Sequence, residues 1–154
     1  NRFDEVARLL QDAGLRVARR SAWQGDVPVA ADVWLGDSIG EMAAYDTLAD
    51  VVLVGGSFAP LGGQNLIEAA ACGCPVVVGP HTFNFAEATE LACEAGAAWR
   101  TPGLPAAADK ALALVQHPYD LEKARAAATA FAQAHRGAAR ATARQVADLL
   151  GVAA

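Results

Sequence analysis

The spacing of apolar and polar residues changes several times along this chain of 154 residues. Between residues 3 and 13 the apolar side chains recur at helical spacing and Gly14 follows them, so we predict a helix that ends at this glycine. Residues 15–20 alternate apolar and basic side chains, which predicts a strand, and residues 21–31 have the composition of a loop.

From residue 32 onwards, short apolar runs alternate with helical segments. The predicted strands cover residues 32–37, 50–56, 74–79 and 96–101, and the predicted helices cover residues 39–48, residues 66–71 and a stretch that ends near Gly96. The uninterrupted apolar run over residues 50–56 is typical of a strand that is covered on both faces. This alternation predicts an α/β fold of three layers, a parallel sheet with helices on both faces.

The last third of the chain has only helical patterns. They cover residues 106–116, 119–135 and 138–150, and His117-Pro118 and Gly137 separate them. The length fits one domain, so we predict a single domain over residues 1–154. Because the chain opens with Asn1 rather than Met, we expect a piece of a longer protein, and such a piece need not hold a complete active site.

The charge of the chain narrows the classes of partner. A formal net charge of −5 and a pI near 5.1 argue against a dedicated nucleic-acid surface, and we predict no nucleic-acid partner. Arg16, Arg19 and Arg20 form a local basic cluster. We favour a solvated strand edge for this cluster, and contact with phosphate or with a membrane surface is the alternative.

The cysteines and the hydropathy pattern exclude two further classes. Cys72, Cys74 and Cys93 are an odd number of thiols with no partners at zinc-ligand spacing, so we expect small buried thiols and no metal site. No apolar run reaches the roughly 18 residues that a membrane span requires, and we expect this piece to be soluble.

Three predicted strand-to-helix junctions share one polar pattern, a capping residue followed three positions later by Glu. They are Ser38 with Glu41, Asn65 with Glu68, and Asn84 with Glu87. Each pair satisfies the requirements of a capping box without any ligand. The carboxyl ends of parallel strands are nevertheless the edge at which α/β sheets bind ligands.

The junction at Asn65 and Glu68 has features that capping alone does not require. Four glycines precede it, at positions 55, 56, 62 and 63, and they permit close backbone approach to a ligand. Free amides at a helix start attract phosphate, whereas the loop matches neither the Walker pattern nor G-x-G-x-x-G. A carboxylate such as Glu68 can accept hydrogen bonds from ribose hydroxyls, so this junction points to a nucleotide-sugar site.

Three segments together, "GDSIGEM", "GGSFAPLGGQNLIEAAACGCPVVVGP" and "HTFNFAE", resemble the C-terminal half of the 3-deoxy-D-manno-octulosonic acid (Kdo) transferases of lipopolysaccharide assembly. The resemblance runs in order from Phe3 to about Gly96. It implies a GT-B glycosyltransferase, in which this chain is the Rossmann-like, donor-binding C-terminal domain with extra C-terminal helices. It also implies CMP-Kdo as donor, a lipid A precursor as acceptor, and a full-length protein at the cytoplasmic face of the bacterial inner membrane.

The resemblance also implies the residues of the site. The CMP contacts would be Ile39, where the family has Met, together with Gly40, Glu41, Asn65, Leu66, Ile67 and Glu68. The phosphate loop would be Gly62, Gly63 and Gln64, with Gln64 where His is usual, and Ser57 and Asn84 are candidate contacts to Kdo. A Pro-Arg pair and the catalytic carboxylate would both lie before Asn1, the latter in an N-terminal domain. We therefore expect no catalytic residue in this chain, no cofactor and no metal, and we expect the piece alone to be inactive.

Two other functions stay open at this point. One is another nucleotide-sugar enzyme of the same architecture, such as a UDP-sugar transferase or an epimerase. The other is a non-catalytic ligand-binding α/β module of flavodoxin-like build. His81 lies in a loop with no visible carboxylate partner, which favours a structural role over general-base catalysis.

Overall fold

A computed structural model describes residues 2–25, 28 and 30–135 of the chain. They form two compact units, Asn1–Met42 and Ala43–Ala154, and each is described by itself. The single domain over residues 1–154 therefore stays a prediction. The helix that we predict over residues 138–150 lies outside the described residues.

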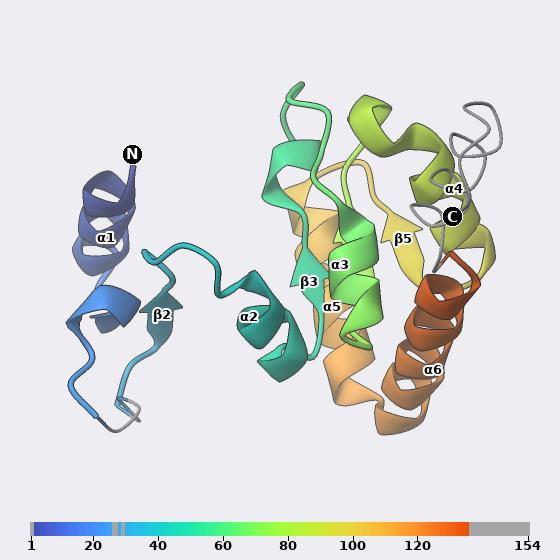
Figure 1. The fold of residues 1–154 in the computed structure, drawn as a ribbon. Helices are drawn as coiled ribbons and strands as arrows, with labels where there is room; N and C mark the ends of the chain where they lie inside the picture. The colour runs from blue at the N-terminus through green and yellow to red at the C-terminus, as the bar shows by residue number, and fades with distance from the viewer. Residues whose placement is uncertain (1, 26–27, 29, 136–154) are drawn as a thin grey trace, which may run out of the picture. The chain divides into compact units, whose positions relative to one another are not determined.

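The first unit contains one helix and a small parallel sheet (Figure 1). Its elements are α1 (Phe3–Asp12), β1 (Val17–Arg19), a 3₁₀ turn η1 (Arg20–Ala22) and β2 (Val33–Leu35). Strands β1 and β2 pair in parallel, with Val17 opposite Val33. Gly14 follows α1 with φ of +81°, which confirms the predicted helix end.

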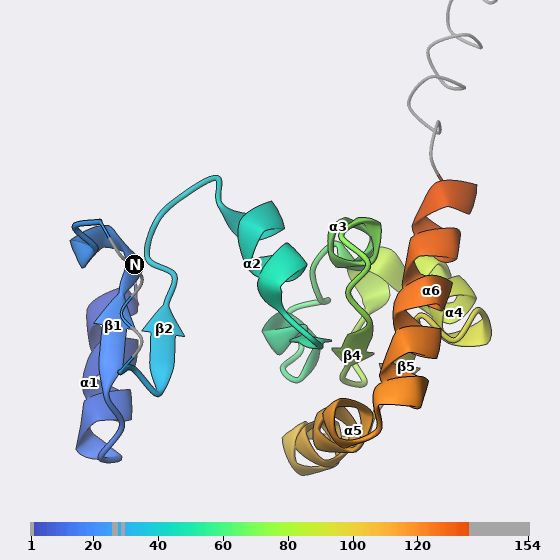
Figure 2. The same cartoon turned by 90° about the horizontal axis from the view of Figure 1, so that it is seen from below.

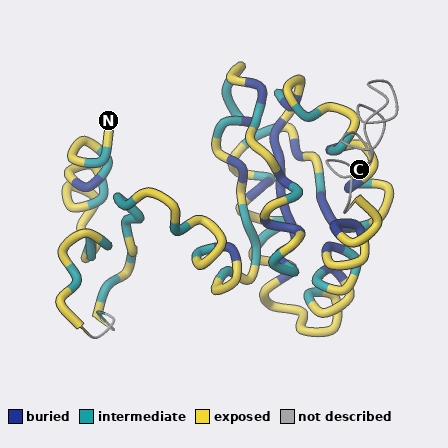
Figure 3. The backbone as a smooth tube through the Cα atoms, in the orientation of Figure 1, coloured by how far each residue is buried: buried dark blue, intermediate teal, exposed yellow. Residues whose placement is uncertain are grey.

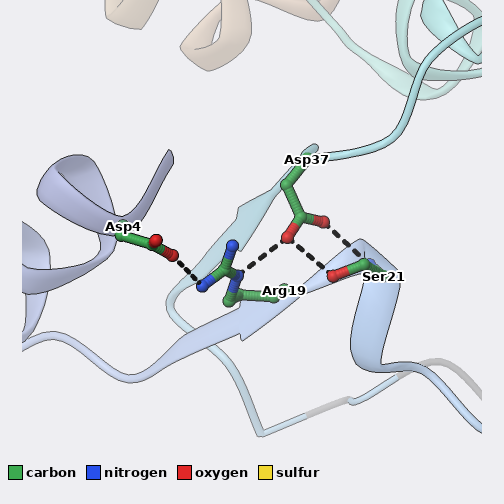
Figure 4. A network of polar contacts seen from close by, with 4 residues as sticks. All are labelled: Asp4, Arg19, Ser21 and Asp37. Carbon is green, nitrogen blue, oxygen red and sulfur yellow. Dashed lines mark hydrogen bonds and ion pairs between the residues drawn. The ribbon is translucent and has the colours of Figure 1, made fainter. Parts of the chain in front are cut away.

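A polar network joins the elements of this unit (Figure 4). The Arg19 guanidinium lies 2.6 Å from an Asp4 carboxylate oxygen and donates from Nε to Asp37, at 2.8 Å. Asp37 also accepts hydrogen bonds from the backbone N–H and the hydroxyl of Ser21, at 2.8 and 2.7 Å. Hydrogen bonds from Ser21, and then from Arg19, hold the pKa of Asp37 well below its usual range.

The basic cluster predicted as a solvated strand edge is thus an ion-paired one. Arg16 lies 2.6 Å from Asp32, and Arg20 lies 2.7 Å from Glu41. Because Arg19 is paired as well, each guanidinium of the cluster already has a carboxylate within the unit.

The second unit is a three-stranded parallel sheet with helices around it. Its elements are α2 (Met42–Leu48), β3 (Val52–Leu53), η2 (Gly55–Ser57), α3 (Leu66–Ala71), β4 (Val76–Val78), η3 (Phe83–Phe85), α4 (Ala86–Glu94), β5 (Ala98–Arg100), α5 (Leu104–Gln116) and α6 (Pro118–Ala134), of which α2 begins on the last residue of the first unit. The strand order is β3-β4-β5, and Val76 lies opposite both Val52 and Ala98. Figure 2 shows α3 and α5 on opposite sides of this sheet, which confirms the predicted layers.

The core of this unit surrounds β4, whose three valines are all buried (Figure 3). Helix α3 packs directly on α6, and both helices bury alanines there, Ala69 and Ala70 on α3 and Ala128 and Ala132 on α6. Small side chains permit this close approach of two helices, so the alanine-rich composition has a packing reason.

Strand β3 differs from its prediction in length and in burial. The run over residues 50–56 forms a strand of only two residues, because the chain turns into η2 at Gly55. Leu53 is exposed, so β3 is not covered on both faces as its continuous apolar run predicts.

Two loops at the carboxyl ends of β3 and β4 are fastened to each other. The Asn84 N–H donates to the Gly62 carbonyl at 3.1 Å, and the Asn84 side-chain Nδ2 donates to the Leu61 carbonyl at 3.2 Å. Gly62 has φ of +87°, and a Cβ added there would lie 2.4 Å from Asn84 Nδ2. We call this contact between Leu61, Gly62 and Asn84 the loop clasp, and it requires a glycine at position 62 for two separate reasons.

The first prediction compares Gly62→Ala with Gly96→Ala. Both glycines have positive φ, but a Cβ at Gly96 meets nothing within 4 Å. Both variants therefore carry backbone strain of about 1–2 kcal/mol, and only Gly62→Ala also displaces the Asn84 side chain and breaks its hydrogen bond to Leu61, at a cost of about 0.5–1.5 kcal/mol. Urea unfolding should show the larger loss for Gly62→Ala. Equal losses in the two variants would contradict the steric role of the clasp.

The second prediction concerns Asp37 and pH. Its pKa is lowered in the folded state, so its stabilising contribution is complete above the unfolded pKa of about 3.9 and is lost as pH falls below it. The T-shaped contact between Trp23 and Trp34 lies in the same unit and reports on it by near-ultraviolet circular dichroism. In Asp37→Asn this signal should melt earlier at pH 7, and its loss below pH 4 should be shallower than in the parent chain. Asp12→Asn, at an exposed position of α1, is the control and should change neither property.

Candidate functional site

The start of α3 is capped by the residues that the sequence predicts. Asn65 is the N-cap, and its Oδ1 accepts the Ile67 N–H at 3.1 Å. Asn65 Nδ2 in turn donates to Glu68 Oε1 at 3.0 Å. The carboxylate thus accepts from the capping side chain rather than from the backbone N–H of a standard capping box. Glu68 is exposed and held in a defined direction at the helix start.

The helices at the other two junctions begin at different residues from those that we predict. Helix α2 begins at Met42, three residues after the predicted start at Ile39, because Gly40 adopts φ of +85° and breaks the helical path. Helix α4 has Phe85 as N-cap, and Asn84 lies within η3 with its side chain in the loop clasp. The same sequence pattern therefore caps α3 at Asn65 but does not cap α4 at Asn84.

The loop before α3 presents backbone amides. The Gly63 N–H is used within the loop, since it donates to the Gly56 carbonyl at 3.3 Å. The backbone N–H groups of Gln64 and Asn65 donate to no acceptor within the part of the chain that the structure describes. Because α3 has only six residues, attraction for an anion comes from these local amides rather than from a long helix dipole.

Ser57 lies inside the loop rather than on its surface. It is 0% exposed, its hydroxyl donates to the Val54 carbonyl at 2.5 Å, and the same oxygen accepts the Gly79 N–H at 2.7 Å. The geometry makes Ser57 an internal brace between the β3 and β4 ends. Its contact with Kdo stays a prediction that this burial does not favour.

Asn84 is exposed but committed to the loop clasp through its side-chain amide. Its predicted contact with Kdo is likewise untested, and its observed contacts are with Leu61 and Gly62. His81 also serves the loops, because its backbone N–H donates to the Ser57 carbonyl at 3.0 Å.

Two residues near the site carry no signal in the sequence. Asp46 on α2 is 5% exposed, and burial, together with the negative charge of Glu68, raises its pKa. Arg100 at the end of β5 donates to the Thr82 hydroxyl at 2.8 Å and lies 2.5 Å from a Glu90 oxygen, so it steadies the loop after β4. Only the fold brings these residues to the site, from separations that no local pattern reveals.

The second half of the predicted CMP site belongs to the first unit. Ile39 is 99% exposed there, and Glu41 accepts hydrogen bonds from Arg20, at 2.7 Å, and from the Ser38 hydroxyl. Since each unit is described by itself, the convergence of this segment with Asn65 and Glu68 stays a prediction.

Within residues 2–25, 28 and 30–135, no group of three or more His, Cys, Asp or Glu side chains could hold a metal ion. Among the same residues, none of the helices combines the length and the hydropathy that crossing a bilayer requires. Of the thiols, Cys74 is buried, and burial raises its pKa to about 11.

Comparisons with known proteins bear on this arrangement, although no protein-family model matches the chain. The 3-deoxy-D-manno-octulosonic acid transferase of Bordetella pertussis is 54% identical over 150 residues, which are 97% of this chain and 35% of that protein. The enzyme of the same name from Haemophilus influenzae is 39% identical over 94 residues, 60% of this chain and 22% of that protein. The chain thus spans about a third or less of the length of these relatives.

A solved structure covers most of the chain. The crystal structure of the C-terminal CMP-Kdo binding domain of WaaA from Acinetobacter baumannii is 34% identical, with a TM-score of 0.79. The match covers 86% of this chain and 68% of that domain. It confirms the predicted Rossmann-like α/β fold of the C-terminal half of a GT-B glycosyltransferase. The chain therefore belongs to the 3-deoxy-D-manno-octulosonic acid transferase family and is a relative of its C-terminal domain.

Proposed function

We propose that this chain binds the donor CMP-Kdo in a glycosyltransferase that transfers Kdo to a lipid A precursor. The observation that carries the proposal is the start of α3, where Asn65 and Glu68 follow a glycine loop at the carboxyl edge of a parallel sheet. The family membership supports it, because the related domain from Acinetobacter baumannii is described as binding CMP-Kdo. The full-length protein would work at the cytoplasmic face of the inner membrane, where it would bind the lipid A precursor.

The parts of the donor would be held by different groups of this site. The backbone N–H groups of Gln64 and Asn65 would donate hydrogen bonds to the CMP phosphate, with Gly62 and Gly63 shaping the loop around it. Glu68 would accept hydrogen bonds from the ribose hydroxyls. The remaining predicted CMP contacts are Ile39, Gly40, Glu41, Leu66 and Ile67.

The chemical contribution of these groups would be electrostatic. In the proposed reaction a base from the N-terminal domain activates a sugar hydroxyl of the acceptor, which attacks the anomeric carbon of Kdo with inversion as CMP leaves. Negative charge grows on the departing phosphate, so fixed amides that face it stabilise the transition state more than the ground state. This chain would supply these hydrogen-bond donors, and the N-terminal domain would supply the base.

The third prediction tests the ribose role of Glu68 in the full-length protein. Losing hydrogen bonds to a charged group costs about 1.5–3 kcal/mol, so Glu68→Ala should lower kcat/KM for CMP-Kdo by about ten- to a hundredfold. Glu87→Ala is the matched control, because Glu87 is exposed and follows Asn84 at the same spacing. Unchanged donor kinetics with a lower melting temperature would make Glu68 a capping residue only.

The fourth prediction tests which nucleotide is recognised. A ligand at a hundred times its Kd stabilises its protein by about 2.7 kcal/mol, so CMP should raise the melting temperature of the full-length protein more than UMP or UDP does. Equal protection by UMP or UDP would favour another nucleotide-sugar enzyme. The isolated chain should bind CMP more weakly than the full-length protein, and equal binding would favour a self-sufficient ligand-binding module.

A further inference from the structure

A cavity lies near the amino-terminal end of β5, away from the loop clasp. It is a cavity of about 490 Å³ between the end of α4, β5, α5 and α6. Ala95 and Gly96, which directly precede β5, form part of its wall. The loops of the candidate donor site instead follow the carboxyl ends of β3 and β4, and the three strands are parallel. The two sites therefore lie toward opposite ends of these parallel strands.

The charge on the wall of this cavity is opposite to that of the chain. The chain has only two lysines, Lys110 and Lys123, and both line the cavity together with His117. Asp120 is the one carboxylate among its lining residues. Neither ammonium group pairs with a carboxylate in the part of the chain that the structure describes. The two lysines thus place positive charge without a paired carboxylate in this cavity, although the chain has a net charge of −5.

The rest of the wall is apolar and includes an aromatic ring. Trp99 lies beneath Lys110, whose Nζ is 4.3 Å from the ring centroid, and Leu114 and several alanines complete the surface. The volume lies in the range of roughly 300–1,000 Å³ that small-molecule sites occupy. Apolar surface with a few convergent charged groups is the composition of a site for an amphiphilic ligand.

We propose that this cavity, the Lys110–Lys123 cavity, binds a small anion that carries an aromatic or other apolar body. The anionic group is neutralised by Lys110 and Lys123, which approach from α5 and α6, and the apolar body lies against Trp99 and Leu114. The site is independent of the proposed donor site. The competing explanation is that the lysine stems only cover apolar surface, and then the charges have no ligand.

The fifth prediction tests this site on the 154-residue chain with 1-naphthyl phosphate as the probe. The Trp99 indole N–H resonance, assigned with Trp99→Phe, should shift with a saturable dependence on probe concentration. The double variant Lys110→Gln with Lys123→Gln keeps most of both stems and removes both charges, so it should raise Kd by about tenfold or more. Arg8→Gln is the matched control, since it removes one exposed charge on α1 and should leave Kd unchanged.

A neutral probe, a variant of the proposed donor site and lipid vesicles provide further tests of this cavity. Neutral 1-naphthol should bind far more weakly than the phosphate, and Glu68→Ala should bind the phosphate as the parent chain does. The proposal would be overturned if the double variant bound the probe as tightly as the parent chain does, or if 1-naphthol bound as tightly as the phosphate. Loss of probe binding in Glu68→Ala would overturn it as well. It would also be overturned if the resonance responded to phosphatidylglycerol vesicles and not to the soluble probe, because a membrane would then be the partner. Matching melting temperatures among the variants exclude unfolding as the cause of any loss.

Discussion

The burial of β4 is the constraint on which the second unit depends. Its three valines are covered on both faces, and β3 and β5 pair with its two edges, so β4 has no freedom to shift register. The loops that follow β3 and β4 therefore leave the sheet at a fixed separation, which is short enough for Asn84 to reach Gly62. The exposed start of α3, with Asn65 and Glu68, inherits its position from this buried strand.

Local patterns predicted most of the helices and strands, and they predicted the Asn65 cap because all of its contacts lie within four residues. They do not reveal contacts with residues that are distant in the sequence, and the predicted cap at Asn84 was wrong for this reason. Asn84 has the same spacing to a Glu as Asn65, but its side chain is taken by a carbonyl 23 residues away. The Ser57 hydroxyl is likewise taken by an amide 22 residues away, so a polar residue after a strand can be a brace as well as a ligand contact.

The arginines and the lysines of the described residues have different surroundings. Arg16, Arg19, Arg20, Arg100 and Arg125 each lie within 2.8 Å of a carboxylate oxygen and fasten elements together. The guanidinium group suits this work, because its planar fork matches carboxylates better than an ammonium does. The lysines, by contrast, stand at a cavity wall without carboxylate partners in the described part of the chain. The two kinds of cation thus occupy different places in the fold, and the sequence alone does not separate them.

The loop clasp affects how scanning mutagenesis of this chain is interpreted. Because the loops after β3 and β4 are fastened together, we expect a substitution that breaks the loop clasp to displace the amides before α3, whether or not the substituted residue contacts CMP-Kdo itself. Its effect on activity would look like that of a lost donor contact. Loss of turnover alone would therefore assign residues that only hold the two loops together to the binding site. Protection from chemical labelling by CMP-Kdo separates the residues of the loop after β4 that bind it from those that do not.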